Sequence, residues 1–273
     1  MADQSGKVAW ITGASSGIGE GLAKAFVADG GAVILSGRKV AELERVASES
    51  GAAERCHILP FETTDFAALP ELAKQAIAWK GQVDILVNNA GISQRSLAVN
   101  TDFSVYQKII DVDLLAPIAL TQALLSHLVG LDKAAVINIS SVAGKIGAPL
   151  RTAYSAAKHG IIGYGDSLRT EVAGQGVQVL NVAPGSVKTD VSRNALNADG
   201  SRRGQSDDAI ENGISPKKCA EIIWQALNDG KREVVVAEGP EATMPQMRAA
   251  EPDKFFDLME QMIAGGYAKE LID

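Results

Sequence analysis

The sequence has few of the residues that build disulfide frameworks or metal sites. It contains two cysteines, Cys56 and Cys219, and three histidines, His57, His127 and His159. The cysteines form no CxxC pair and the histidines no HxxxH pattern, so neither a disulfide scaffold nor a structural metal is indicated. Two widely spaced cysteines suit a reducing compartment, and we expect a cytoplasmic protein.

Long apolar runs and an excess of positive charge are also missing. No apolar run reaches membrane-spanning length, and the opening MADQSGKVAW lacks the basic and apolar regions of a secretory signal. The 33 acidic residues outnumber the 26 basic ones, which gives a net charge of −7. Such a chain has no overall field that would draw it to nucleic acid or anionic lipid, and we expect neither as a partner.

The order of short apolar runs indicates the fold class. The 273 residues are 46% hydrophobic and contain nothing that resembles an interdomain linker, so we expect one domain over 1–273. Segments with helical periodicity separate the runs, which predicts an α/β fold with a doubly wound parallel sheet covered on both faces. The seven expected strands are 7–12, 32–37, 56–61, 83–88, 134–140, 177–183 and 233–237.

Two further segments have distinct compositions. Residues 186–212 are polar and rich in Gly, Ser, Asn and Arg, and a connection of that length is expected to be a mobile flap over a site. Within it, Arg202 and Arg203 are interpreted as a solvated charge pair, not an anion clamp. The tail, 239–273, has apolar residues at helical spacing and is expected to form one or two amphipathic helices.

A glycine-rich turn follows the first expected strand. In TGASSGIGEGLAKAF, Gly13, Gly17 and Gly19 would let backbone amides approach a phosphate at a helix N-terminus. The spacing is GxxxGxG, not the usual GxGxxG, and a tight strand-to-helix turn is the alternative interpretation. Its place after strand one of an α/β pattern favours dinucleotide binding.

The second expected strand ends in LSGRK, which bears on cofactor choice. An acidic residue there would bind ribose hydroxyls, whereas an arginine would pair with a 2′-phosphate. This chain has no acid at that point and has Arg38 instead, which favours NADP(H) over NAD(H). A surface arginine is the alternative.

Tyr154 and Lys158 in AYSAAKHG are four residues apart. On a helix they would lie on one face, where an ammonium favours the ionised form of a phenol. Taken alone, this spacing is more typical of a packed tyrosine beside a solvated lysine. The choice depends on the rest of the chain.

Several motifs together resemble the short-chain dehydrogenase/reductase family over residues 5–237. They are TGASSGIG at 12–19, NNAG at 88–91, ISS at 139–141, YSAAK at 154–158 and PGSVKT at 184–189. The resemblance implies a single Rossmann-like domain that transfers hydride between NADP(H) and a substrate. It also implies a homodimer or homotetramer, formed through helices near 103–129 and 152–173.

The resemblance assigns roles to individual residues. Tyr154 would be the general acid for carbonyl reduction and the general base for alcohol oxidation. Lys158 would favour the ionised phenol and bind the nicotinamide ribose, while Ser141 would orient the substrate oxygen. The implied cofactor-binding residues, besides Tyr154 and Lys158, are Gly13, Ser15, Ser16, Gly17, Ile18, Gly19, Arg38, Glu62, Thr63, Asn89, Gly91, Pro184, Gly185, Val187 and Thr189.

Two positions depart from the family pattern. The family usually has asparagine where this chain has Asp113, and that asparagine helps to hold a water for proton relay. We expect a working enzyme with an altered relay. The second departure is Glu62, which stands where aspartate commonly contacts the adenine amino group; a solvated strand-end acid would look the same.

The leading hypothesis is an NADP(H)-dependent oxidoreductase acting on a secondary alcohol/ketone pair. The stretches SGRKVAELERV and SSVAGKIGAPLRTAYSAAKHG look most like the hydroxysteroid and dehydrogenase/reductase branch, without identifying a steroid. A 3-oxoacyl reductase is an alternative within the same class. Two alternatives belong to other functional classes. One is a nucleotide-binding sensor or scaffold that retains the cofactor site without turnover, and Asp113 is the feature that favours it. The other is a protein whose main role is assembly.

Overall fold

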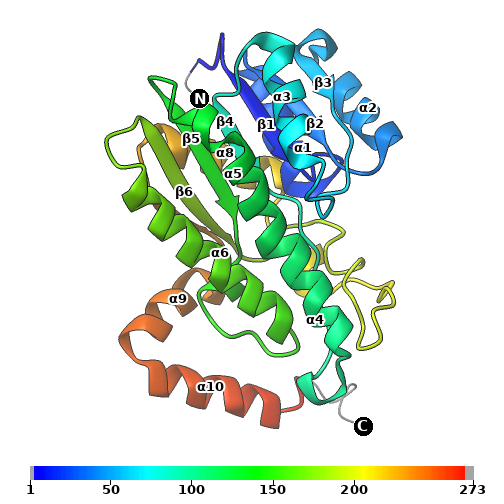
Figure 1. Ribbon diagram of the computed structural model, residues 1–273. Coiled ribbons are helices and arrows are strands. Elements are labelled where there is room, and N and C mark those ends of the chain that lie inside the picture. Colours follow the sequence, from blue (N-terminus) through cyan, green and yellow to red (C-terminus); the bar gives the residue numbers. More distant parts are fainter. Residues whose placement is uncertain (1–2, 268–273) are drawn as a thin grey trace.

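A computed structural model describes residues 3–267, so the last six residues of the predicted tail lie outside the described residues. Seven parallel strands form one sheet in the order β3-β2-β1-β4-β5-β6-β7 (Figure 1). The doubly wound α/β prediction is therefore confirmed. The strands are β1 (Val8–Thr12), β2 (Ala32–Ser36), β3 (Cys56–Ile58), β4 (Ile85–Asn88), β5 (Ala134–Ile139), β6 (Val177–Pro184) and β7 (Glu233–Val236).

Helices cover both faces of the sheet because the central strands are buried on both sides. One face carries α1 (Gly17–Ala28), α2 (Val40–Glu49) and α8 (Pro216–Asn228). The other carries α3 (Leu69–Lys80), α5 (Ala116–Leu128) and α6 (Thr152–Glu171). Apolar side chains from each helical layer meet the strands in two large clusters, which supply the hydrophobic driving force for the fold.

The remaining helices lie around the ends of the strands. They are α4 (Phe103–Ile110), the short α7 (Asp208–Glu211), α9 (Pro240–Ala250) and α10 (Pro252–Ala264). The last two form the predicted helical tail, and Figure 1 places them far from the N-terminus, near one end of α6. Phe255 and Met259 of α10 pack with Val142 and Ile146, which follow β5, so the tail closes over the loop after that strand.

One helical run, Phe103–Leu128, is long and apolar enough by length and composition to span a membrane. It is the exception to the expected absence of membrane-length segments. In the fold, its second half, α5, packs against α3, β5 and α6. The run contains the π-helical turn η3 (Asp111–Leu115), which separates α4 from α5. Pro117 has no N–H to donate to the carbonyl of Asp113, which is consistent with the break in the regular helical pattern.

A buried row of asparagines connects three strands beneath α6. The Nδ2 atom of Asn88 donates to Oδ1 of Asn138 at 2.9 Å, and Nδ2 of Asn138 donates to Oδ1 of Asn181 at 3.2 Å. Asn181 Nδ2 donates in turn to the carbonyl of Ile162 on α6 at 3.1 Å. Gly165 lets the helix approach this row, because a Cβ there would overlap Oδ1 of Asn181. The row thus fixes α6 against the sheet.

We predict that Gly165→Ala lowers the free energy of unfolding by about 1–3 kcal/mol, because the added methyl group overpacks the asparagine row. Its Cβ would also lie 2.9 Å from Nδ2 of Asn138. Gly163→Ala on the same helix is the matched control: nothing lies within 4 Å of its Cβ, and helix propensity favours alanine. Urea unfolding followed by circular dichroism measures both. A Gly165→Ala variant as stable as the parent would contradict the packing argument.

Candidate active site

A large cleft opens at the carboxyl ends of the central strands. Strands β2 and β3 extend the sheet on one side of β1, whereas β4 to β7 extend it on the other, so β1 and β4 flank the switch point where open α/β sheets bind ligands. The cleft contains about 1760 Å³ of empty volume, part of which is open solvent. All four predicted catalytic residues line it, and so do all the predicted cofactor-binding residues except Gly19.

The glycine turn joins β1 to α1 on one wall of the cleft. Gly13 and Gly17 have φ angles of 64° and 57°, a conformation that favours glycine. Ser16 caps α1 in an extended conformation without a side-chain hydrogen bond to the helix, which leaves the first amides of α1 available to a ligand. Gly19 lies beneath the turn, where a Cβ would overlap the carbonyl of Gly13. Its contribution is therefore close packing.

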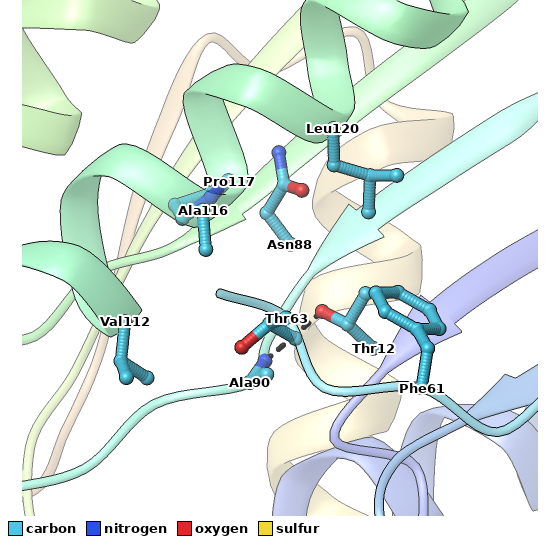
Figure 2. A pocket seen from close by; sticks show the side chains of 9 residues that line it. All are labelled: Thr12, Phe61, Thr63, Asn88, Ala90, Val112, Ala116, Pro117 and Leu120. Carbon is cyan, nitrogen blue, oxygen red and sulfur yellow. Dashed lines mark hydrogen bonds between the residues drawn. The ribbon is translucent and has the colours of Figure 1, made fainter. Parts of the chain in front are cut away.

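The NNAG segment holds this turn in place. Nδ2 of Asn89 donates to the carbonyls of Thr12 and Gly13 at 2.8 and 3.2 Å. Oγ1 of Thr12 accepts hydrogen bonds from the backbone N–H groups of Asn89 and Ala90 at 3.0 and 3.1 Å. Figure 2 shows the bond between Thr12 and Ala90 in the wall of a second, smaller pocket. The residues that line both this pocket and the cleft are Phe61, Thr63, Ala90 and Val112.

A buried ion pair lies between the cleft and the sheet. Nζ of Lys158 is 3.1 Å from Oδ2 of Asp113 and donates to the carbonyl of Ile139 at 3.0 Å. Oδ1 of Asp113 accepts from the backbone N–H of Ile92 at 2.8 Å. Burial disfavours the charged ammonium, but the interactions of Lys158 with the Asp113 carboxylate and with Tyr154 together outweigh burial and raise the pKa of Lys158. Gly91 makes room for the pair, since a Cβ there would lie 2.9 Å from Asp113 Oδ2.

Tyr154 and Ser141 complete the predicted catalytic group. Tyr154 lies one helical turn before Lys158 on α6, as its spacing predicts, and the Lys158 ammonium is 5.5 Å from the centre of its ring. Ser141 follows β5 and caps η4 (Val142–Gly144), where its Oγ accepts from the N–H of Ala143 at 3.1 Å. Both side chains line the cleft, so residues 13 positions apart meet at one site.

Arg38 and Glu62 meet at the opposite end of the cleft. Nη1 of Arg38 is 3.4 Å from Oε2 of Glu62, and both side chains are exposed. Exposed ion pairs of this kind contribute little to stability, so the arginine can exchange its partner at low cost. The neighbouring Lys39 also lines the cleft. The sequence anticipated both residues separately but not their pairing.

Known proteins support a family assignment. The model of the short chain dehydrogenase family matches residues 7–200. The chain is 39% identical over 259 residues to the dehydrogenase/reductase SDR family protein 7-like of Drosophila melanogaster, covering 93% of this chain and 79% of that protein. It is 37% identical over 256 residues to the dehydrogenase/reductase SDR family member 7B of Xenopus laevis, covering 91% and 79%.

The chain belongs to the short-chain dehydrogenase/reductase family. It is thus an NAD(P)-dependent oxidoreductase, and its fold agrees with solved structures. A short chain dehydrogenase/reductase from Burkholderia phymatum in complex with NAD superposes with a TM-score of 0.82 at 22% identity, covering 94% of this chain and 97% of that one.

Sequence reasoning missed the residue of this short-chain dehydrogenase/reductase that fixes the loop after β6. Glu241 at the start of α9 accepts two hydrogen bonds from Ser186. The backbone N–H of Ser186 donates one at 2.6 Å, and its hydroxyl donates the other at 3.0 Å. Pro184 and Gly185, just before Ser186, line the cleft together with Val187 and Thr189. No motif signals this contact, because Glu241 lies 55 residues further along the chain.

The prediction for Arg203 was wrong. It is not solvated: only 17% of its side chain is exposed, and its Nη1 is 2.8 Å from Oδ1 of Asp207. Arg202 is exposed and lines the cleft, as does Leu196 from the same segment. The 186–212 segment thus borders the cleft as expected, but Asp207 anchors part of it through contacts with distant residues that the sequence did not reveal.

Proposed function

We propose that this protein is an NADP(H)-dependent oxidoreductase that interconverts a secondary alcohol and a ketone, with Tyr154 as the general acid and base. One observation carries the proposal. Tyr154, Ser141 and Lys158 lie on the wall of a single cleft that also contains the glycine turn. Proton transfer groups and a phosphate cradle in one cleft are what hydride-transfer chemistry at a carbonyl requires.

The residues present fit a dinucleotide. The amides at the start of α1 and the left-handed Gly13 and Gly17 would hold the pyrophosphate. Lys158 would bind the nicotinamide ribose, and the segment from Pro184 to Thr189 would contact the nicotinamide side. Arg38 and Lys39 support a preference for NADP(H), because they offer positive charge where a 2′-phosphate would lie.

The residues of the chain would supply the proton chemistry, whereas the bound cofactor supplies or accepts hydride. During reduction, Tyr154 gives its phenolic proton to the substrate carbonyl oxygen, and during oxidation it takes the hydroxyl proton. Ser141 donates a hydrogen bond to the same oxygen and orients it. The charge of Lys158 favours the ionised phenol. These side chains come from the β5 end and from α6, which the sheet holds in fixed positions.

Asp113 would modify this arrangement. Its carboxylate keeps Lys158 protonated, but it also offsets the positive charge that acts on Tyr154. The same ion pair is the observation that favours the second candidate function, an NADP(H)-binding sensor or scaffold with weakened catalysis. A 3-oxoacyl compound remains an alternative substrate.

We further propose a cytoplasmic homodimer or homotetramer. Large apolar side chains on the Phe103–Leu128 run support self-association, since Phe103 is 73% exposed and Leu115 is 42% exposed. The two cysteines, Cys56 and Cys219, are unpaired in the structure, in keeping with a reducing compartment.

Tyr154→Phe is expected to lower NADPH-dependent turnover by about 10²–10⁴-fold, because it removes the proton donor and leaves the ring in place. The measurement is NADPH oxidation, followed by absorbance, against a panel of ketones and aldehydes. NADPH affinity, measured by fluorescence, is the control and should stay within about twofold of the parent. A parent protein that binds NADPH tightly and turns over nothing in the panel would favour the sensor.

Arg38→Ala is expected to weaken NADPH binding by about 10- to 100-fold, because it removes a charged hydrogen-bonded contact with the 2′-phosphate. NADH affinity should change far less. Isothermal titration calorimetry with both cofactors measures the difference, and Arg55→Ala, which removes an exposed arginine on another segment, controls for net charge. Equal losses for the two cofactors would remove the argument for NADP(H).

Asp113→Asn is expected to preserve or raise turnover, because asparagine keeps a side-chain oxygen that can accept from the backbone N–H of Ile92 and adds amide donors without the negative charge. The measurement is kcat/KM for carbonyl reduction and for alcohol oxidation, each compared with the parent protein. Complete inactivation would instead assign an essential role to the carboxylate.

A further inference from the structure

Three arginines from separate segments converge on one carboxylate next to the cleft. Oδ1 of Asp207 is 3.1 Å from Nη2 of Arg95 and 2.8 Å from Nη1 of Arg203. Its Oδ2 is 3.1 Å from Nη2 of Arg151. The four side chains are between 11% and 24% exposed. We call Arg95, Arg151, Arg203 and Asp207 the arginine cluster.

The arginine cluster carries more positive charge than its carboxylate balances. Within residues 3–267, Asp207 is the only acid in ion-pair contact with any of the three guanidinium groups. Burial and, after it, the neighbouring charge of Arg95 lower the pKa of Arg151. Uncompensated buried charge is unfavourable, so a second anion would stabilise the cluster.

Unused hydrogen-bond donors accompany the surplus charge. A guanidinium has five N–H donors, but in the described part of the chain the hydrogen bonds of Arg151 involve Nη2 alone and those of Arg203 involve Nη1 alone. Nη1 of Arg95 is buried without any hydrogen-bond partner. Asp207 therefore orients the three guanidinium groups but leaves some of their N–H donors without an acceptor. Arg151 has the largest exposed fraction of the four side chains, 24%.

The cluster adjoins the predicted proton donor. Arg151 is the N-cap residue of α6 and lies three residues before Tyr154 in the sequence. Tyr154 is close enough to affect the pKa of Arg151. The backbone N–H of Arg95 donates to the carbonyl of Leu196, a residue that lines the cleft. Leu150, next to Arg151, holds a φ of 64°, a strained conformation for a residue other than glycine.

We propose that the arginine cluster is an anion subsite and that the substrate carries a carboxylate or phosphate group, which Arg151 binds beside Tyr154 with support from Arg95 and Arg203. The substrate class rests on the proposed function, whereas the anion subsite does not. Asp207 is a positioning residue that holds the three guanidinium groups together. Guanidinium forks match the planar or tetrahedral oxygens of such groups and bind them through paired hydrogen bonds.

Anion binding tests the subsite without turnover. With NADPH saturating the cofactor site, inorganic phosphate and butyrate are titrated at constant ionic strength, and binding is followed by calorimetry and by the thermal midpoint Tm. Arg151→Gln should weaken binding by about tenfold, and Arg151→Lys should restore part of it. Arg55→Gln, which removes a distant exposed charge, should bind like the parent. The stronger of the two anions identifies the group.

Asp207→Asn separates anion binding from loop anchoring. If the cluster is an anion subsite, loss of the carboxylate increases the surplus charge, and phosphate should raise the Tm of this variant more than that of the parent. If the cluster only anchors the loop, the variant should lose stability that phosphate does not restore. Phosphate binding that is absent in the parent, or unchanged in Arg151→Gln, would overturn the proposal.

Matched substrates test the substrate class. Each oxo acid is compared with its methyl ester, and each oxo phosphate monoester with its dephosphorylated alcohol. The anionic member should have a kcat/KM at least about tenfold higher, and Arg151→Gln should abolish that preference. Efficient reduction of the neutral members without preference would refute the anionic substrate and leave the proposed function intact. Anion binding that depends on Arg151 with no turnover of any compound would refute the function and leave the subsite intact.

Discussion

The buried ammonium of Lys158 is the constraint on which the rest of the site depends. Lys158 is only 5% exposed, and a buried charge persists only where other groups compensate it; here those groups come from two separate segments. Ile139 at the end of β5 offers its carbonyl, and Asp113 in the π-helical turn offers its carboxylate. Gly91, which follows β4, leaves space for Asp113 and Lys158. The position of α6 relative to β4 and β5 is therefore fixed by electrostatics as well as by packing.

Helix α6 is also held by hydrogen bonds on its sheet-facing side, and these bonds fix the position of Tyr154. Oγ of Ser140 donates to the carbonyl of Lys158 at 2.7 Å, and the asparagine row holds the middle of α6 through Asn181. Buried polar groups are costly unless satisfied, so these bonds penalise any sliding of the helix. A proton donor on such a helix loses little freedom when it meets substrate. Gly165 on this face of α6 permits that close approach.

Local sequence patterns were enough to predict the fold, because apolar strands and glycine turns are encoded by neighbouring residues. Six of the seven strands fall within the predicted runs, and β6 extends one residue beyond its run, to Pro184. Strand β3 ends at Ile58, shortly before Pro60, whose nitrogen carries no hydrogen to donate. The family motifs brought Ser141 and Tyr154 to one cleft as expected. The arginine cluster was not predictable, because its members come from distant parts of the sequence. Asp207, which binds Arg203, also binds Arg95, and Arg95 lies 112 residues before Asp207. Spacing carries no information on such contacts.

The C-terminal tail contacts two segments that lie beside the cleft, although it lies beyond the residues that the family motifs cover. Glu241 at its start binds the loop after β6, next to the expected nicotinamide position, while the hydroxyl of Tyr267 accepts from Nη2 of Arg95 at 3.2 Å. Between them, α10 packs on the loop that follows Ser141. A change in the tail would therefore alter the arginine cluster and the loop after β6 together. This coupling gives a physical reason for substrate choice to vary in a family whose proton-transfer residues stay in place: the tail and the 186–212 segment can reshape the cleft without moving α6.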